Sequence, residues 1–325
     1  MVHEYVGIDI GNSGLRATRL DVDRQRLAGT LRLYWQPQET STRHTSEQRF
    51  LPSDKAWQAK LEHFMHTEFP GTADSSATVT SALDVNSGEA GEPARDSFAQ
   101  RSIVWLVSSV RRDALATLHD FVQRFPNHQL WVINSTHIPL KIDIEFPEKV
   151  GVDRLLAALA ASQATLQRPC IVIQAGSAVT VDLVARHSTS AQLTPQRDNS
   201  ADTFCGGAIM PGVPMILRLL GKGADMLPEL DADDLTDLPN LPGKNTEQAM
   251  LAGAASCLVG GAIHLVHRYR KQWGMETPVI ISGGDGMRLA PFIDSPHQVK
   301  PHLVEHGLLE LATRHASNLI STELS

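Results

Sequence analysis

Cysteine and basic charge are both scarce in this chain. Its 325 residues include three cysteines, at positions 170, 205 and 257. They are too few and too scattered to form a disulfide framework or a zinc site, which predicts a reducing compartment. Acidic residues outnumber basic ones by 36 to 29, and the net charge of −7 argues against a nucleic-acid-binding surface. We therefore expect no nucleic-acid partner.

Long apolar runs and the lysine-containing phosphate loop are lacking as well. No segment reaches the roughly 18 uninterrupted apolar residues of a membrane span, and the N-terminus is acidic by Glu4, unlike a signal peptide. These features predict a cytoplasmic protein with no membrane partner. The chain also has no Gly-x-x-x-x-Gly-Lys-Ser/Thr pattern. Any bound phosphate must therefore be held by backbone N–H groups, a metal ion and a few local cations.

The sequence has instead a pair of related glycine turns. Residues 9–14 read Asp-Ile-Gly-Asn-Ser-Gly, and residues 174–178 read Gln-Ala-Gly-Ser-Ala. Each turn follows an apolar strand pattern and precedes a second strand-like run, as in a hairpin. Because glycine lets the backbone approach closely, the tip of such a hairpin can hold phosphate oxygens with its N–H groups. Two such hairpins suggest two homologous halves that close on one nucleotide.

Strand and helix patterns alternate along the chain, which predicts an α/β fold. We expect a first domain at 1–150 and a second at 151–325. The expected strands are 4–10, 15–22, 26–35, 103–107, 130–133, 170–174, 178–185, 204–210 and 279–282, and the expected helices are 54–69, 111–125, 151–167, 213–220 and 246–273. Residues 70–101 lose apolar periodicity and are expected to form a mobile insertion, and the polar residues 187–202 a second loop insertion.

The predicted helix at 246–273 carries glycines that are unusual for a helix interior. They are Gly253, Gly260 and Gly261. Each glycine costs up to ~1 kcal/mol relative to alanine. Their presence indicates close packing of this helix against another backbone.

Several short motifs follow one another in a fixed order. They are Asp-Ile-Gly-Asn-Ser at 9–13, Ser-Ser-Val at 108–110, Gly-Val-Asp-Arg at 151–154, Gly-Ser-Ala-x-Thr-x-Asp at 176–182, Gly-Gly-x-Ile-x-Pro-Gly at 206–212, Asn-Thr at 245–246 and Ser-Gly-Gly-Asp-Gly at 282–286. Each string alone recurs by chance, but the series resembles the type III pantothenate kinases of the actin-like, acetate and sugar kinase superfamily. The resemblance covers most of the chain.

This resemblance implies a fold and an activity. The fold would be two actin-like, ribonuclease H-like domains with a nucleotide cleft between them. The activity would be ATP-dependent phosphorylation of pantothenate to 4'-phosphopantothenate, the first step of coenzyme A biosynthesis. ATP with Mg²⁺ would be the cofactor, and the resemblance also implies a homodimer.

Asp9 is the expected magnesium residue of the first turn. A carboxylate at the end of a strand, beside a phosphate-binding turn, can hold Mg²⁺ directly or through water. Gly11, Asn12 and Ser13 would shape the turn and bind phosphate, with Ser13 replacing the family's usual threonine. The alternative is that Asp9 only accepts hydrogen bonds from its own turn.

The Gly-Val-Asp-Arg motif supplies the expected catalytic group. The resemblance implies that Asp153 is the general base that accepts the proton of pantothenate's primary hydroxyl. Gly151, Val152 and Arg154 would bind the substrate or the developing charge. The alternative is that Asp153 begins a helix and Arg154 is a surface charge.

The second hairpin departs from the family pattern. Gly176 and Ser177 match its phosphate-binding residues, but Gln174 stands where the family has an aspartate that helps to hold a monovalent cation. An amide offers a carbonyl oxygen but no negative charge, so attraction for K⁺ or NH₄⁺ is weaker. Asp182 is expected to lie too far along the hairpin to replace it. This leaves a cation-independent enzyme, a site completed elsewhere, or a weakened homologue.

Two further motifs have both a functional and a structural interpretation. Thr246 resembles the family threonine that contacts pantothenate, but Asn245 or Thr246 could equally cap the following helix. Gly283 and Gly284 resemble the adenosine-side loop, or else form a simple strand-to-helix turn. His302 and His306 have helical spacing with Glu305 between them, and a polar helix face is favoured over metal binding.

Two other functions compete with the pantothenate kinase. One is a non-catalytic regulator, since relatives of the family are described as accessory transcription factors and Gln174 is consistent with degeneration. The intact Asp9, Asp153 and Arg154 argue against it. The other is a kinase of the same superfamily that acts on a different small alcohol.

Overall fold

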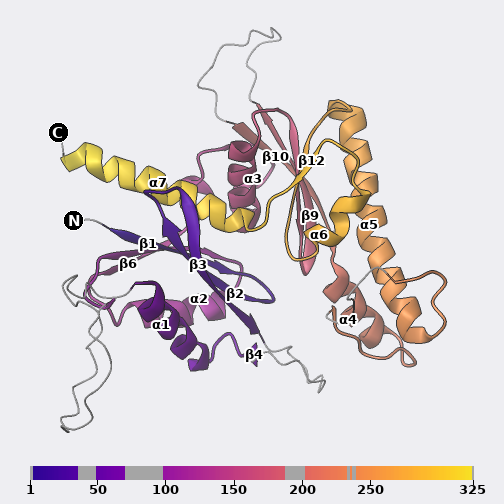
Figure 1. The fold of residues 1–325 in the computed structure, drawn as a ribbon, viewed down its shortest axis with the longest axis horizontal. Coiled ribbons are helices and arrows are strands. Elements are labelled where there is room, and N and C mark those ends of the chain that lie inside the picture. Colours follow the sequence, from indigo (N-terminus) through magenta and orange to yellow (C-terminus); the bar gives the residue numbers. More distant parts are fainter. Residues whose placement is uncertain are drawn as a thin grey trace, which may run out of the picture.

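The computed structural model describes residues 3–35, 49–69, 98–186, 202–232, 235 and 239–323. Within them the chain forms two mixed sheets with helices packed on their faces (Figure 1). The first half contains β1 (Glu4–Ile10), β2 (Gly14–Asp21), β3 (Arg26–Trp35), β4 (Arg49–Phe50), α1 (Ala56–Glu68), β5 (Ile103–Ser109), α2 (Arg112–Val122) and β6 (His128–Val132).

The second half begins with a short edge strand. It contains β7 (Lys141–Ile142), α3 (Val152–Ala164), β8 (Cys170–Ala175), β9 (Ala178–Arg186), β10 (Asp202–Pro211), α4 (Val213–Gly223), α5 (Thr246–Trp273), β11 (Val279–Ser282), α6 (Gly286–Leu289), β12 (His297–Val299) and α7 (Leu303–Glu323). Single 3₁₀ turns lie at Ser135–His137, Pro147–Lys149 and Ala290–Phe292.

Both sheets have the same strand order. The first runs β4-β3-β2-β1-β5-β6 and the second runs β12-β11-β8-β9-β10-β7. In each half, three antiparallel strands joined in sequence are extended on one side by two strands parallel to the first of them. This repeated order confirms the predicted α/β class with two ribonuclease H-like halves.

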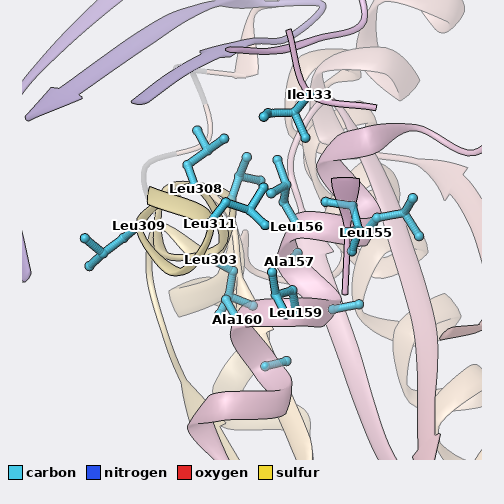
Figure 2. Close-up of a cluster of buried hydrophobic side chains, with 14 of the residues drawn as sticks. Ile133, Leu155, Leu156, Ala157, Leu159, Ala160, Leu303, Leu308, Leu309 and Leu311 are labelled. Atoms are coloured by element: carbon cyan, nitrogen blue, oxygen red, sulfur yellow. The ribbon is translucent and has the colours of Figure 1, made fainter. Parts of the chain in front are cut away.

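Two helices of the second half join the sheets through one apolar core. Leu155, Leu156 and Leu159 of α3 pack with Leu308 and Leu311 of α7 (Figure 2). The same buried cluster contains side chains from β1, β2 and β5 of the first sheet and from β8, β9, β10 and β11 of the second. The C-terminal helix α7 therefore ties the second half to the first.

Glycine permits this close approach of α7. A Cβ atom on Gly307 would lie 2.3 Å from the carbonyl oxygen of Leu156, far inside contact distance. On the other side of the helix, Leu308 reaches β1, where a Cβ on Gly7 would meet its Cδ1 atom at 3.2 Å. Small residues thus set the spacing of β1, α7 and α3.

The remaining helices cover the outer faces of the sheets. α1 and α2 bury side chains such as Trp57, Leu61 and Phe121 against the first sheet. Among the described residues, α5 is the one helix that is long and apolar enough to cross a membrane by length and composition. Its Leu258 and Val266 are nevertheless buried in the core of the second half, which is the position of a core helix.

The last four residues of the expected insertion at 70–101 are part of the ordered fold. Residues 70–97 lie outside the described residues, as do 187–201 of the second expected insertion. Phe98, however, is fully buried, with its ring 5.0 Å from that of Phe125, and its carbonyl oxygen is bonded to Nε2 of His128. The burial of Phe98 could not be predicted from the sequence, because a single aromatic residue after a polar stretch has no periodicity.

Candidate active site

The two glycine turns meet between the two sheets. The first hairpin turn (residues 11–13) joins β1 to β2, and the second (residues 176 and 177) joins β8 to β9. The hydroxyls of Ser13 and Ser177 are hydrogen-bonded to each other across the two halves. The turns that the sequence separates by more than 160 residues therefore form one locus.

Backbone contacts fix the shape of the first hairpin turn. Gly11 N–H donates to the Gly14 carbonyl at 2.9 Å and closes the turn. Trp35 of β3 supports it from the neighbouring strand, donating its indole N–H to the Gly11 carbonyl at 3.0 Å and its backbone N–H to the Ser13 carbonyl at 2.9 Å. Any side chain on Gly14 would clash, since its Cβ would lie 2.1 Å from the Leu33 carbonyl oxygen.

The second hairpin turn has a similar closure and closer neighbours. Gly176 N–H donates to the Ala178 carbonyl at 3.1 Å. The end of β10 packs against this turn so tightly that a Cβ on Gly212 would lie 1.9 Å from the Gly176 carbonyl oxygen. Gly283 adopts a φ of +92°, and a Cβ there would lie 2.2 Å from the Ala175 carbonyl oxygen. The turn at 283–286 therefore lies beside the second hairpin turn.

Asp9 lies one residue before the end of β1 in an acidic environment. Its pKa is raised to about 7, first by burial and then by the charges of Glu305 and Asp153, against the opposing effects of the Arg16 charge and a hydrogen bond with Ser108. Among the described residues, no lysine, arginine or histidine forms an ion pair with Asp9. A carboxylate with excess negative charge around it and no cationic partner suits a divalent cation, so these residues fit Mg²⁺.

Asp153 lies in the first turn of α3, close enough to Asp9 for its charge to raise the pKa of Asp9. Its Oδ1 accepts the backbone N–H of Arg154 at 2.9 Å. Burial raises the pKa of Asp153, opposed by that hydrogen bond and by the charge of Arg154. Gly151 leaves space for the carboxylate, since a Cβ there would lie 2.4 Å from the Asp153 Oδ1 atom.

Arg154 is held by a residue that the sequence analysis did not assign. Its Nε atom donates to Asp182 Oδ2 at 3.2 Å, and its Nη2 atom bonds the other carboxylate oxygen. Asp182 is fully buried in β9, and Gly207 of β10 makes room for it. The Phe204 ring packs against the guanidinium, with its centroid 5.5 Å from the Arg154 Cζ atom. Arg154 is therefore an oriented group, not the surface charge of the alternative interpretation.

Gln174 lies among neutral side chains. Its neighbours in the sheet are Thr180 of β9 and Ser282 of β11. The carboxylate of Asp182 is engaged by Arg154.

Thr246 is the first residue of α5, and the helix cap is its neighbour. The Asn245 side chain accepts the backbone N–H of Gln248 at 2.8 Å. Among the described residues, no hydrogen bond links Thr246 to Asp153 or to either hairpin turn. The contacts of the described residues therefore connect Thr246 with its own helix start and leave its proposed role to be tested.

Arg16 and Glu305 belong to the site although the sequence did not indicate them. Arg16 lies opposite Asp9 in the β1–β2 pair, and its Nη1 atom bonds Oε1 of Glu305 on α7. In the segment where a polar helix face was expected, His306 is exposed and His302 is partly exposed, but the Glu305 side chain between them is 1% exposed. Although burial opposes it, His302 and Arg16 lower the pKa of Glu305 to about 2. The only signal in the sequence was an acidic residue beside apolar ones in a helical segment.

Two ribonuclease H-like halves whose glycine hairpins meet beside buried carboxylates define a class of phosphate-binding proteins with the actin-like fold. A model of the type III pantothenate kinase family matches residues 64–268. A type III pantothenate kinase of Rhodopirellula baltica is 34% identical over 183 residues, which cover 55% of this chain and 60% of that protein. One from Polaromonas is 29% identical over 189 residues, 57% of this chain and 67% of that protein. The chain belongs to the type III pantothenate kinase family.

Solved structures with similar architecture are more distant in sequence. A Baf family transcriptional activator from Campylobacter jejuni is 16% identical with a TM-score of 0.46, covering 96% of this chain and 99% of the other. A non-polymerisable ParM mutant is 10% identical with a TM-score of 0.45, covering 96% and 100%. The chain spans about 60% of the length of the Rhodopirellula relative.

Proposed function

We propose that the protein transfers the γ-phosphoryl group of ATP to the primary hydroxyl of pantothenate, giving 4'-phosphopantothenate, the first step of coenzyme A biosynthesis. The observation that carries this proposal is the contact of the two hairpin turns at Ser13 and Ser177, with Asp9 and Asp153 within electrostatic reach of each other. Family membership supports the choice of pantothenate as substrate.

The hairpin turns would bind the phosphates of ATP. The backbone N–H groups of Asn12, Ser13 and Ser177 and the two serine hydroxyls would face the phosphates. Gly11 and Gly176 would shape the two turns, since their own N–H groups close them. Asp9 would hold Mg²⁺, directly or through water; when bound, the ion would neutralise charge on the β- and γ-phosphate oxygens. Gly283 and Gly284 would lie on the adenosine side, and Gly284 has no neighbour that a side chain there would meet within 4 Å.

Asp153 would act on the acceptor alcohol. The hydroxyl oxygen of pantothenate attacks the γ-phosphorus, the bond from that phosphorus to the bridging oxygen of ADP breaks, and Asp153 takes the hydroxyl proton. Phosphoryl transfer depends mainly on positioning and electrostatics, so a well-placed carboxylate suffices. Arg154, held by Asp182, would neutralise charge on the transferred group or bind the substrate, with Gly151 and Val152 beside it.

Four finer assignments complete the proposal. Thr246 would contact pantothenate. Gln174 would stand at the family's monovalent-cation position, where three neutral side chains offer K⁺ or NH₄⁺ only weak attraction. We place the domain boundary at 150/151, although the edge strand β7 before it pairs with β10 in the second sheet. The helix α7 of the second domain packs on the first, and we place the enzyme in the cytoplasm.

The proposed homodimer uses the exposed face of α5. Gly253 and Gly260 are exposed there, and a Cβ atom on either would meet nothing within 4 Å. Gly261 differs, because a Cβ there would lie 2.7 Å from the Met210 sulfur. Contacts within the described residues of one chain therefore do not explain why two glycines that destabilise the helix lie on this face. A closely packed second copy of the chain would explain them.

The test is release of ADP from Mg-ATP, measured with pantothenate, with other primary alcohols and with no acceptor. We expect saturable release that depends on pantothenate, and mass spectrometry should show one phosphate added per ADP formed. Stronger dependence on another alcohol would replace pantothenate as the substrate. No acceptor-dependent release with any alcohol would contradict the kinase and favour the regulator.

A further inference from the structure

We propose that Glu305 of α7 is a positioning residue that draws Arg16 away from Asp9 and so keeps the Asp9 carboxylate open to Mg²⁺. This inference rests on the proposed role of Asp9 in the function above. It assigns to the C-terminal helix a part in metal binding, although that helix contributes no group to the metal.

The strand register makes an ion pair between Asp9 and Arg16 the expected arrangement. The two residues are directly opposite in the antiparallel β1–β2 pair. Side chains in such positions lie on the same face with Cβ atoms about 4.5–5.5 Å apart, and opposite charges there attract. An arginine in this position would ordinarily neutralise Asp9 and compete with a cation for its oxygens.

The structure shows a different pairing. Arg16 donates its Nη1 atom to Glu305, whereas no described cationic side chain is paired with Asp9. Glu305 lies in the first turn of α7, and its neighbours Leu303 and Val304 are buried in the central core. The packing of α7 therefore fixes the position of the Glu305 carboxylate, which binds the Arg16 guanidinium.

The geometry of this pair is not that of an ion pair optimised for stability. The Nε atom of Arg16 and the Oε2 atom of Glu305 are both buried and have no hydrogen-bond partner. A bidentate pairing would satisfy both atoms and would be stronger. Burying two charges with part of their bonding capacity unused costs free energy, which is consistent with a pair retained for what it does to Asp9.

The charges act in the same direction as the geometry. Glu305 adds negative potential at Asp9 that outweighs the positive potential of Arg16. Loss of the Glu305 charge would therefore have two effects on a divalent cation at Asp9. It would remove an attractive charge, and it would free Arg16 to swing onto the Asp9 oxygens.

The experiment measures Mn²⁺ binding by electron paramagnetic resonance, with saturating ADP, to the full chain. The variants are Glu305→Gln, Arg16→Gln, the Glu305→Gln/Arg16→Gln double variant and Asp9→Asn. We expect Glu305→Gln to weaken Mn²⁺ binding on the order of tenfold, the effect of one nearby charge pair. The double variant should recover most of that loss, and Arg16→Gln alone should bind at least as tightly as the wild type.

A kinetic measurement separates positioning from a merely structural role. In Glu305→Gln the KM for Mg²⁺ should rise while kcat at saturating Mg²⁺ stays within a few fold of the wild type. Unchanged Mn²⁺ affinity in Glu305→Gln, or no recovery in the double variant, would overturn the inference. If Glu305→Gln does not fold, weaker binding by Arg16→Gln overturns it and equal or tighter binding supports it.

The proposed function fails in a distinguishable way. If Asp9→Asn binds Mn²⁺ as tightly as the wild type, the metal is not at Asp9, and the role of Asp9 is wrong whatever Glu305 does. If Asp9→Asn loses the ion and Glu305→Gln keeps it, Asp9 retains its role and only the inference about Glu305 is overturned.

Discussion

Asp9 and Asp153 are the same ionisable group in two settings. Asp9 is surrounded by the charges of Glu305 and Asp153, and its pKa is raised to about 7. Asp153 has the Arg154 backbone and charge beside it, and burial still raises its pKa. The negative charges around Asp9 favour a bound cation, which is its proposed role. Asp153 lies next to the oriented Arg154, which suits its proposed role as the base that acts on the acceptor.

The raised pKa of Asp9 predicts that Asp9→Asn stabilises the metal-free protein at high pH. Because the pKa rises from its ordinary 3.8 to about 7, the folded state holds a proton that the unfolded state has lost between these values. The contribution of Asp9 to stability therefore falls as pH rises from about 4 to 7, and the buried charge is unfavourable above that range. Thermal unfolding of Asp9→Asn should show a higher Tm than the wild type at pH 8 and a smaller gain at pH 5.

The control for this experiment is Asp23→Asn, on an exposed turn of the same half. It removes one charge from the surface and should shift Tm little at either pH. An equal shift at both pH values in Asp9→Asn, or a lower Tm at pH 8, would show that the Asp9 carboxylate is not under electrostatic strain.

Gln174 predicts a weak response to monovalent cations. One added negative charge at a few ångströms is worth on the order of 4 kcal/mol at an effective dielectric of ~20, before the ion's desolvation offsets much of it. We expect Gln174→Asp to be activated by K⁺ more strongly than the wild type. Titration of both proteins with KCl, balanced with choline chloride, measures this. Strong and saturable activation of the wild type would mean that another residue completes the site.

Turn residues of the site could be predicted from sequence, and the pairs that orient its side chains could not. Gly11 and Gly176 were found because turn chemistry is local. Asp182 and Arg154 are 28 residues apart, and Arg16 and Glu305 are 289 apart. No periodicity connects such residues, since their contact is set by how β9 and α7 pack.

At the scale of elements, α5 has two different faces. One face buries Leu258, Ala262 and Val266 against the second sheet. The other exposes Gly253 and Gly260 with no atom of the chain near their missing side chains. The glycine pattern was visible in the sequence, but which glycines face outward was not, because Gly261 turned out to pack on Met210.

The exposed glycines predict that Gly260→Leu dissociates the proposed dimer. In an isolated chain, replacing this glycine would stabilise the helix by up to ~1 kcal/mol. Against a close-packed second copy, the same side chain would clash. Light scattering after size-exclusion chromatography should show a shift toward monomer for Gly260→Leu and none for Lys60→Leu on the exposed face of α1. A dimer that survives Gly260→Leu would exclude this face as the interface.

At the scale of the whole molecule, the protein is a duplicated sheet joined by one core. The duplication was foreseen from the paired hairpin turns, and the strand order matches in both halves. The central packing of α3 with α7 was not foreseen. Close approaches such as that of Gly307 to Leu156 join segments about 150 residues apart and leave no local signal. The same packing holds Glu305 next to the β1–β2 pair.

The measurement that tests the central claim most directly compares wild type and Asp153→Asn in phosphoryl transfer from Mg-ATP to pantothenate. Product is quantified by mass spectrometry, and ATP binding and unfolding are measured on the same samples. We predict 4'-phosphopantothenate from the wild type, and loss of at least about 100-fold in kcat for Asp153→Asn, the usual contribution of a general base, with ATP affinity and Tm nearly unchanged. Near-normal kcat in Asp153→Asn would contradict the account.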